Sequence, residues 1–120
     1  MFLSKFNADG DLLWAGGHGD TSLTLLSHLG RSVGSSVAVD ANDNVYVCGS
    51  YSGTIDFDLG SGVSQFTSPN HPLTWVDDNR DIFIMKLDKW GNTVWAKTIG
   101  GRANDQAWHI NVDKLGDVYV

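Results

Sequence analysis

Residues 82–96 read IFIMKLDKWGNTVWA, and they repeat residues 1–15, which read MFLSKFNADGDLLWA. A second block does the same: residues 35–47, SSVAVDANDNVYV, return at residues 108–120 as WHINVDKLGDVYV. The first block returns after 81 residues and the second after 73. Repetition on this scale is typical of repeat architectures, in which each unit has an apolar face that a neighbouring unit covers.

The repeat divides the chain into a first unit, residues 1–81, and a partial second unit, residues 82–120. One unit and about half of another are too little to close a ring of repeats, so the sequence predicts a fragment of a longer repeat protein. The uncovered faces and the strand edge of such a fragment predict contact with further units of the parent chain, or self-association.

The acidic residues indicate the fold class, because all fourteen are Asp and none is Glu. Asp, Asn and Gly favour turns whereas Glu favours helix, so the chain predicts short strands joined by tight turns. The net charge of −6, with Lys and Arg scattered singly, argues against a nucleic-acid surface. The sequence also has no apolar run of the roughly 18 residues that a membrane span needs, and no apolar core of signal-peptide length.

Alternation of apolar and polar residues predicts two kinds of hairpin. One spans residues 3–15 and returns at 82–98, and the other spans residues 37–48 and returns at 108–120. Four antiparallel strands in a unit of this length are typical of a propeller blade with long loops. The predicted fold is therefore all-β, with four-stranded antiparallel propeller blades, of which about one and a half are present. A β-sandwich is the main alternative.

The links between the hairpins are less regular. In residues 49–80, Ile55, Phe57 and Leu59 alternate with polar residues, which predicts a strand extension with these three side chains on one face. The rest of that segment is predicted to be a long loop. Residues 18–32 contain spaced leucines before a glycine, which predicts one or two helical turns.

These segments resemble the bacterial β-propeller repeat family called SBBP, for seven-bladed β-propeller. The resemblance is carried by DIFIMKLDKWGNTVW at residues 81–95, by a Gly-Gly pair followed by Asp105, and by NVDKLGDVY at residues 111–119. It covers most of the chain. It departs from the family at residues 18–33, where an insertion replaces a compact link, and at Asp43, where the family has glycine.

The resemblance implies an extracellular or cell-envelope bacterial protein, in which many blades stand in tandem as scaffold or adhesion modules. It implies no catalytic residues. Trp14 and Trp95 then suit packing between blades, where a buried aromatic ring contributes a large apolar area. Lys5 and Lys86 alternate outward from the core positions and pair with a nearby Asp.

Several residue clusters suggest binding chemistry but lack its spacing. The Asp-rich turns at residues 7–11 and 40–44 resemble calcium loops, yet they lack the later ligand of such a loop, so their side chains are expected to bond their own backbone. The single Cys48 is expected to be a small buried or half-buried residue. Only one of the histidines is expected to lie in a strand, namely His109, and together they lack zinc-ligand spacing. The four histidines are His18, His28, His71 and His109.

In a four-stranded blade the short Asp-Gly turns fall at one end and the long links, residues 16–33 and 49–81, fall at the other. Rigid scaffolds commonly place binding residues on such loops, so any ligand is expected there. The candidate residues are His71, Trp75, Asp77, Asp78 and Arg80.

The sequence thus predicts a non-enzymatic structural or interaction module, with no catalytic residue, no metal and no cofactor. The alternative is a carbohydrate-binding or calcium-dependent, lectin-like propeller. The expected partners are further blades, a second copy of the chain, or a protein or glycan ligand.

Overall fold

The computed structural model describes residues 1–18, 30–68, 80–101 and 103–120. Within these ranges the protein is all-β, and every pairing between strands is antiparallel. The helical turns predicted in residues 18–32 fall almost entirely outside the described residues. The strands are β1 (Phe2–Phe6), β2 (Leu12–Gly17), β3 (Arg31–Val39), β4 (Val45–Ser52), β5 (Thr54–Asp56), β6 (Gln65–Thr67), β7 (Asp81–Leu87), β8 (Thr93–Ile99), β9 (Asn111–Val112) and β10 (Val118–Tyr119).

The turns of the four main hairpins all have the same conformation and the same hydrogen-bond pattern. The side-chain oxygen of the first turn residue accepts hydrogen bonds from the backbone N–H groups two and four residues later; for Asp40 these donors are Asn42 at 2.8 Å and Asn44 at 2.9 Å. The fourth residue of each turn has a positive φ, which glycine adopts without strain and Asp tolerates. The first and fourth residues are Asn7 and Gly10, Asp40 and Asp43, Asp88 and Gly91, and Asp113 and Gly116.

The central layer is a four-stranded sheet with the strand order β3-β4-β7-β8. Its middle pair joins the two repeat copies, because β4 belongs to residues 1–81 whereas β7 begins the second copy; their register runs from Val45 opposite Leu87 to Tyr51 opposite Asp81. The sheet is therefore offset by one hairpin from the boundaries of the sequence repeat.

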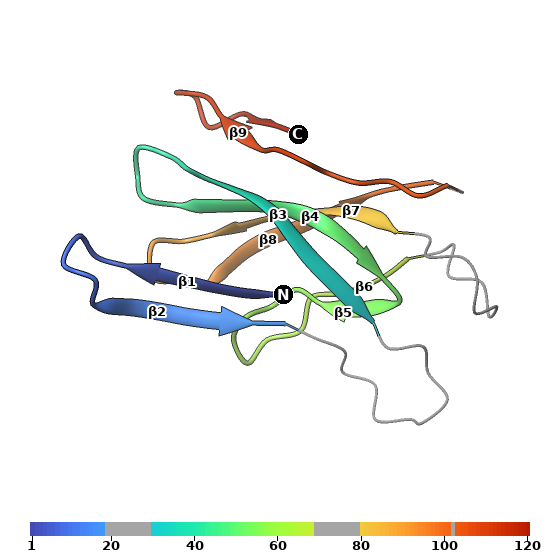
Figure 1. Ribbon diagram of the computed structural model, residues 1–120, viewed down its shortest axis with the longest axis horizontal. Coiled ribbons are helices and arrows are strands. Elements are labelled where there is room, and N and C mark those ends of the chain that lie inside the picture. The colour runs from blue at the N-terminus through green and yellow to red at the C-terminus, as the bar shows by residue number, and fades with distance from the viewer. Residues whose placement is uncertain (19–29, 69–79, 102) are drawn as a thin grey trace.

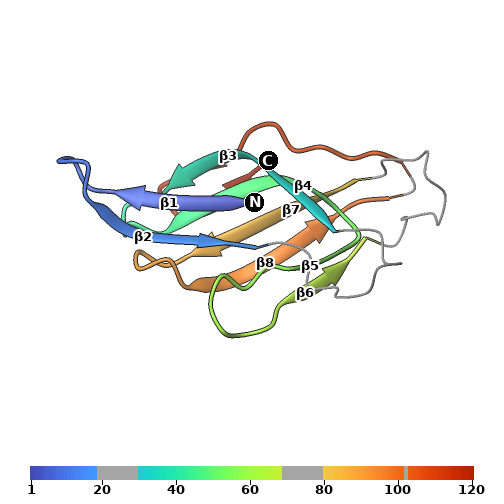
Figure 2. The same cartoon turned by 60° about the horizontal axis from the view of Figure 1, so that its bottom comes forward.

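The remaining hairpins cover the two faces of this sheet. Figure 1 shows β1–β2 on one side of the sheet and β9–β10 on the other. In Figure 2 the bottom of that view is turned forward, so that the strands β1 and β2 overlap the sheet. The four short turns lie together at one end of the layers in Figure 1, and the described ends of the long links lie toward the opposite end, as predicted.

Strand β4 is buried along its whole length because it contacts both outer layers. Its alternate residues belong to two apolar clusters: Val45 and Val47 face the β1–β2 side, whereas Tyr46 and Cys48 face the β9–β10 side. Cys48 is fully buried, which confirms the prediction for this residue.

The short hairpin β5–β6 completes the first cluster. Ile55 and Phe57 are fully buried in it, and Leu59 packs against it, which confirms that these three residues share one face. The prediction that His109 lies in a strand is wrong. The β9–β10 ladder contains the pairs Val118–Val112 and Tyr119–Asn111, so His109 lies beyond its end.

Candidate functional site

Arg80 is the one residue of the predicted loop site that lies in the described part of the chain. Its backbone N–H donates to Asn104 Oδ1 at 3.2 Å, and its carbonyl oxygen accepts from the N–H of Asp105 at 2.7 Å. These contacts tie the end of the long link to the segment that follows β8. The other four candidates, His71, Trp75, Asp77 and Asp78, lie outside the described residues.

The Asp-rich turns use their side-chain oxygens for hydrogen bonds within the turn. In the first turn, Asn7 Oδ1 accepts from the N–H groups of Asp9 and Asp11, and Asn7 Nδ2 donates to Asp11 Oδ2. In the turn after β3, both carboxylate oxygens of Asp40 accept hydrogen bonds as well. The prediction that these side chains bond their own backbone is confirmed.

Asp40 is also the centre of a small polar cluster between β4 and β7. Tyr46 donates its hydroxyl to Asp40 Oδ2 at 3.1 Å, and Lys86 Nζ lies 4.0 Å from the same oxygen and 5.0 Å from the centre of the Tyr46 ring. Burial would raise the pKa of Asp40, but hydrogen bonds from Asn44, Asn42 and Tyr46 outweigh it and lower the pKa to about 2. The pairing of Lys86 with an Asp was predicted; the participation of Tyr46 was not.

The second repeat copy contains the equivalents of two members of this cluster, Asp113 and Tyr119. Tyr119, which is equivalent to Tyr46, donates its hydroxyl to Asp113 Oδ2 at 3.2 Å, as Tyr46 does to Asp40. The difference is exposure: Tyr46 is 1% exposed and Tyr119 is 59% exposed. The repeat equivalent of Lys86 is Lys5, which lies on β1 in the opposite outer layer.

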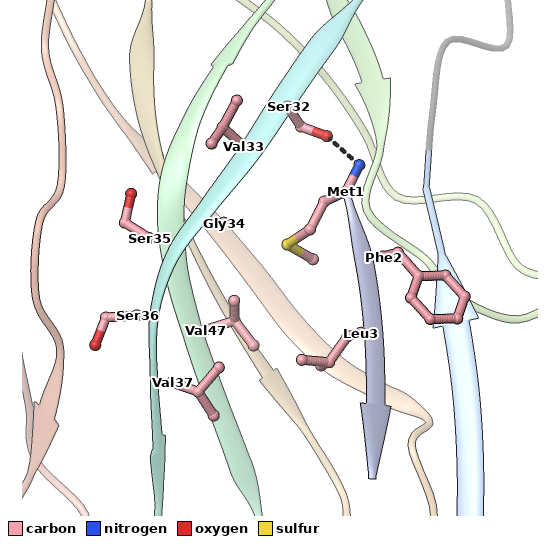
Figure 3. Close-up of a pocket in the computed structure, with 10 residues that line it drawn as sticks. All are labelled: Met1, Phe2, Leu3, Ser32, Val33, Gly34, Ser35, Ser36, Val37 and Val47. Atoms are coloured by element: carbon pink, nitrogen blue, oxygen red, sulfur yellow. Dashed lines mark hydrogen bonds between the residues drawn. The ribbon is translucent and has the colours of Figure 1, made fainter. Parts of the chain in front are cut away.

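A groove of about 480 Å³ runs between β1 and β3 (Figure 3). The N-terminal amine of Met1 donates to Ser32 Oγ at 2.9 Å at one end of it, and the side chains of Leu3, Val37 and Val47 lie around its other end. Val37 is 50% exposed although it lies on the sheet face that the outer hairpin approaches. The groove lies between the edges of β1 and β3 and is lined by apolar side chains and by serines. Its lining residues are Met1, Phe2, Leu3, Ser32, Val33, Gly34, Ser35, Ser36, Val37 and Val47.

His18, just after β2, is buried between the hairpin β1–β2 and the sheet. Its ring lies 4.9 Å from that of Phe57 and 5.9 Å from that of Phe83, and its Nδ1 is 3.2 Å from Ser32 Oγ. Burial, with a smaller effect of the N-terminal amine, lowers its pKa to about 4. Its Nε2 has no hydrogen-bond partner among the described residues. His18 is therefore a neutral, packed side chain at neutral pH.

Within the described ranges, no group of three or more His, Cys, Asp or Glu side chains is placed to hold a metal ion. The same part of the chain contains no helix that is long and apolar enough to cross a membrane. Neither the scan against models of protein families nor the search of curated proteins found a match for this chain.

Sequence reasoning did not find the groove or the exposed Tyr119 cluster. The groove depends on how far the hairpin β1–β2 lies from β3, which no local pattern encodes. The Tyr119 cluster had a usable signal, because the repeat aligns Asp113 and Tyr119 with Asp40 and Tyr46.

Proposed function

We propose that this chain is a non-enzymatic structural or interaction module, a segment of a tandem-blade bacterial β-propeller of the SBBP type that acts at the cell surface or outside the cell. The observation that carries the proposal is the equivalent placement of Trp14 and Trp95. Trp14 packs against the cluster on one face of the central sheet, and Trp95 packs against the cluster on the other. One repeated residue thus serves two successive interfaces between layers.

Stacking of this kind supports a scaffold role. Each layer presents apolar side chains to the next, so the layers can continue in a tandem array, and the interfaces between neighbours supply much of the stability. Aromatic and aliphatic side chains pack between the layers. The carboxylates of Asp40, Asp88 and Asp113 accept hydrogen bonds within their own turns. This division favours a structural module over a catalytic one.

The proposal is tested by extending the array with the chain's own sequence. Residue 120 is the repeat equivalent of residue 47, so an extended protein is made by adding a second copy of residues 48–120 after Val120. This addition supplies β10 with the strands that β4 has. We expect a higher melting temperature than that of the single chain, because the outer layer gains a paired edge and a covered face.

The control adds the same 73 residues in shuffled order. We call the proposed role, in which each hairpin layer is stabilised by stacking on the next, the stacked-layer function. An extended protein that melts no higher than this control would contradict it. The same samples are incubated with a glycan array, with and without calcium, and with a panel of polysaccharides. We expect neither calcium-dependent binding nor turnover; a calcium-dependent glycan signal would favour the lectin-like alternative.

A further inference from the structure

Two strands at opposite faces of the molecule have edges without a neighbouring strand in the described structure. β1 pairs with β2, and β10 pairs with β9; on its other edge neither has a described partner. The repeat makes β1 the equivalent of β7 and β10 the equivalent of β4. In the central sheet β4 and β7 pair with each other along seven residue positions. The open edges of β10 and β1 are therefore the repeat equivalents of two strand edges that pair with each other in the central sheet.

We propose that the open edge of β1 binds β10 of a second copy of this chain and so completes a four-stranded sheet from two molecules. This inference rests on the stacked-layer function proposed above and names its partner. The register follows from the β4–β7 pairs Val45–Leu87, Tyr46–Lys86 and Val47–Met85. The corresponding pairs between two chains are Val118 with Phe6, Tyr119 with Lys5, and Val120 with Ser4.

The polar cluster supports this register. In the central sheet Lys86 lies over the ring of Tyr46 and near Asp40. On the β10 edge, Tyr119 is already hydrogen-bonded to Asp113 in the same way. The proposed register brings Lys5 of the first chain over Tyr119 of the second chain and beside Asp113 of that second chain, and so supplies the third member of the cluster. The interaction joins opposite charges and covers an exposed aromatic ring.

The groove supports it independently. In the layer contact that is present, Ile110 is 2% exposed and belongs to the same apolar cluster as Tyr46. Its repeat equivalent is Val37, which lines the groove and is 50% exposed. A second chain whose β10 lies along β1 brings Tyr119 toward Val37, as Tyr46 is brought toward Ile110. Val37 in the groove and Tyr119 on β10 are both exposed in a single chain, and the proposed contact between two chains would cover both.

The contact is head-to-tail, because one chain uses β1 and the other uses β10. Each chain keeps its second edge for a further molecule, so association continues into rings or filaments rather than stopping at a two-fold dimer. Three backbone pairs make a short ladder, and contact of Tyr119 with Val37 in the groove adds to it. We expect association that depends on protein concentration, with a mass above the 13.0 kDa of one chain.

Disulfide cross-linking between two single variants tests the register. Lys5→Cys and Tyr119→Cys are purified separately, mixed at high concentration and oxidised mildly. Antiparallel partners have Cα atoms close enough for a disulfide. We expect a linked pair of chains, with mass spectrometry placing the bond between positions 5 and 119. Native Cys48 is fully buried and competes little.

The matched control mixes Lys5→Cys with Val118→Cys, which is one residue out of register and has its side chain on the opposite face of the strand. We expect at least about tenfold less cross-linking for this mixture. The mixture of Ser4→Cys with Val120→Cys repeats the in-register test without touching Tyr119, in case loss of its hydroxyl unfolds the turn.

Equal cross-linking in and out of register would overturn the proposal, and so would a mass of 13.0 kDa for the unmodified chain at millimolar concentration by light scattering. If the protein extended by residues 48–120 is stabilised but neither in-register mixture cross-links, this edge pairing fails while the stacked-layer function stands. If the in-register mixtures cross-link selectively, the edge pairing is supported whatever the melting temperature of the extended protein.

Discussion

Trp14 Nε1 donates a hydrogen bond to the carbonyl oxygen of Lys89 at 3.1 Å, although the two residues lie 75 positions apart in the chain. The bond joins the outer hairpin β1–β2 to the turn between β7 and β8. The ring also packs against Gly91 of that turn. A residue of the first repeat copy is thus fixed on the turn of the second, which places the outer layer on the sheet.

Replacing Trp14 tests how much this contact contributes. Trp14→Phe keeps an apolar ring but loses the hydrogen bond, and we expect a loss of about 0.5–1 kcal/mol in the free energy of unfolding. Trp14→Ala also loses the apolar area, and we expect a loss of about 2–3 kcal/mol. Urea unfolding followed by circular dichroism measures both. Trp108→Ala is the control, because Trp108 is 78% exposed and its removal should change stability by less than about 0.5 kcal/mol.

Two glycines with nearly the same backbone separate conformational strain from packing. Gly10 has φ +89 and a Cβ added there would meet open space, whereas at Gly91, with φ +92, a Cβ would meet Trp14 Cδ2 at 2.8 Å. Gly10→Ala should therefore cost only the left-handed backbone, about 1 kcal/mol. Gly91→Ala should cost about 1–3 kcal/mol more, because the ring must move. Equal losses in chemical denaturation would refute the packing of Trp14 on this turn.

His18 should make the protein less stable as the pH falls from 6.5 to about 4. Burial lowers its pKa from 6.5 to about 4, so over this range the unfolded chain binds a proton that the folded chain does not. Below the folded pKa both states are protonated and this contribution no longer changes. His18→Phe keeps a ring beside Phe57 and Phe83, and its melting temperature should depend less on pH between 6.5 and 4. Melting temperatures at half-unit pH steps give the comparison, and parallel curves for the two proteins would contradict it.

Asp40 should contribute to the loss of stability in a separate, more acidic window. Its pKa is lowered from 3.8 to about 2 in the folded protein, so its stabilising effect is complete above pH 3.8 and is lost as the pH falls toward 2. Asp40→Asn should be less stable at pH 7, because Tyr46 and Asn44 lose the carboxylate that accepts their hydrogen bonds. It should also lose less stability between pH 3.8 and 2 than the unmodified protein does.

Asp43→Asn is the matched control for this change. Asp43 lies at the tip of the same turn with φ 64, a conformation that Asn adopts readily. Its side chain is exposed. Acid unfolding followed by circular dichroism should therefore give the same curve for Asp43→Asn as for the unmodified protein.

The sequence was sufficient for the hairpins because each is a local structure. The turn from Asp40 to Asn44 depends on an acceptor at its first position and a residue that tolerates positive φ at its fourth, and both are readable from the residues. The same holds for the shared face of Ile55 and Phe57, which follows from alternation. The all-β class with antiparallel strands was therefore predictable from the sequence, whereas the propeller arrangement stays a prediction.

The assembly of the hairpins was not predictable in the same way. Whether β4 pairs with β7 or with a strand of its own repeat copy depends on register and on contacts between distant segments, which a period in the sequence leaves open. His109 was wrongly placed in a strand because the β9–β10 ladder is shorter than the apolar pattern around it. The loop candidates Trp75 and Asp78 remain a prediction, and the groove beside Val37 appears only when the layers are in place.

The offset between the sequence repeat and the sheet determines how the molecule resists being pulled apart. The junction between the two repeat copies falls between β4 and β7, the two inner strands of the central sheet, which are paired along seven positions. Separating the copies would break the most buried ladder in the described structure. We therefore expect heat or denaturant to unfold the two copies together rather than as independent modules, because the junction between them lies inside one sheet.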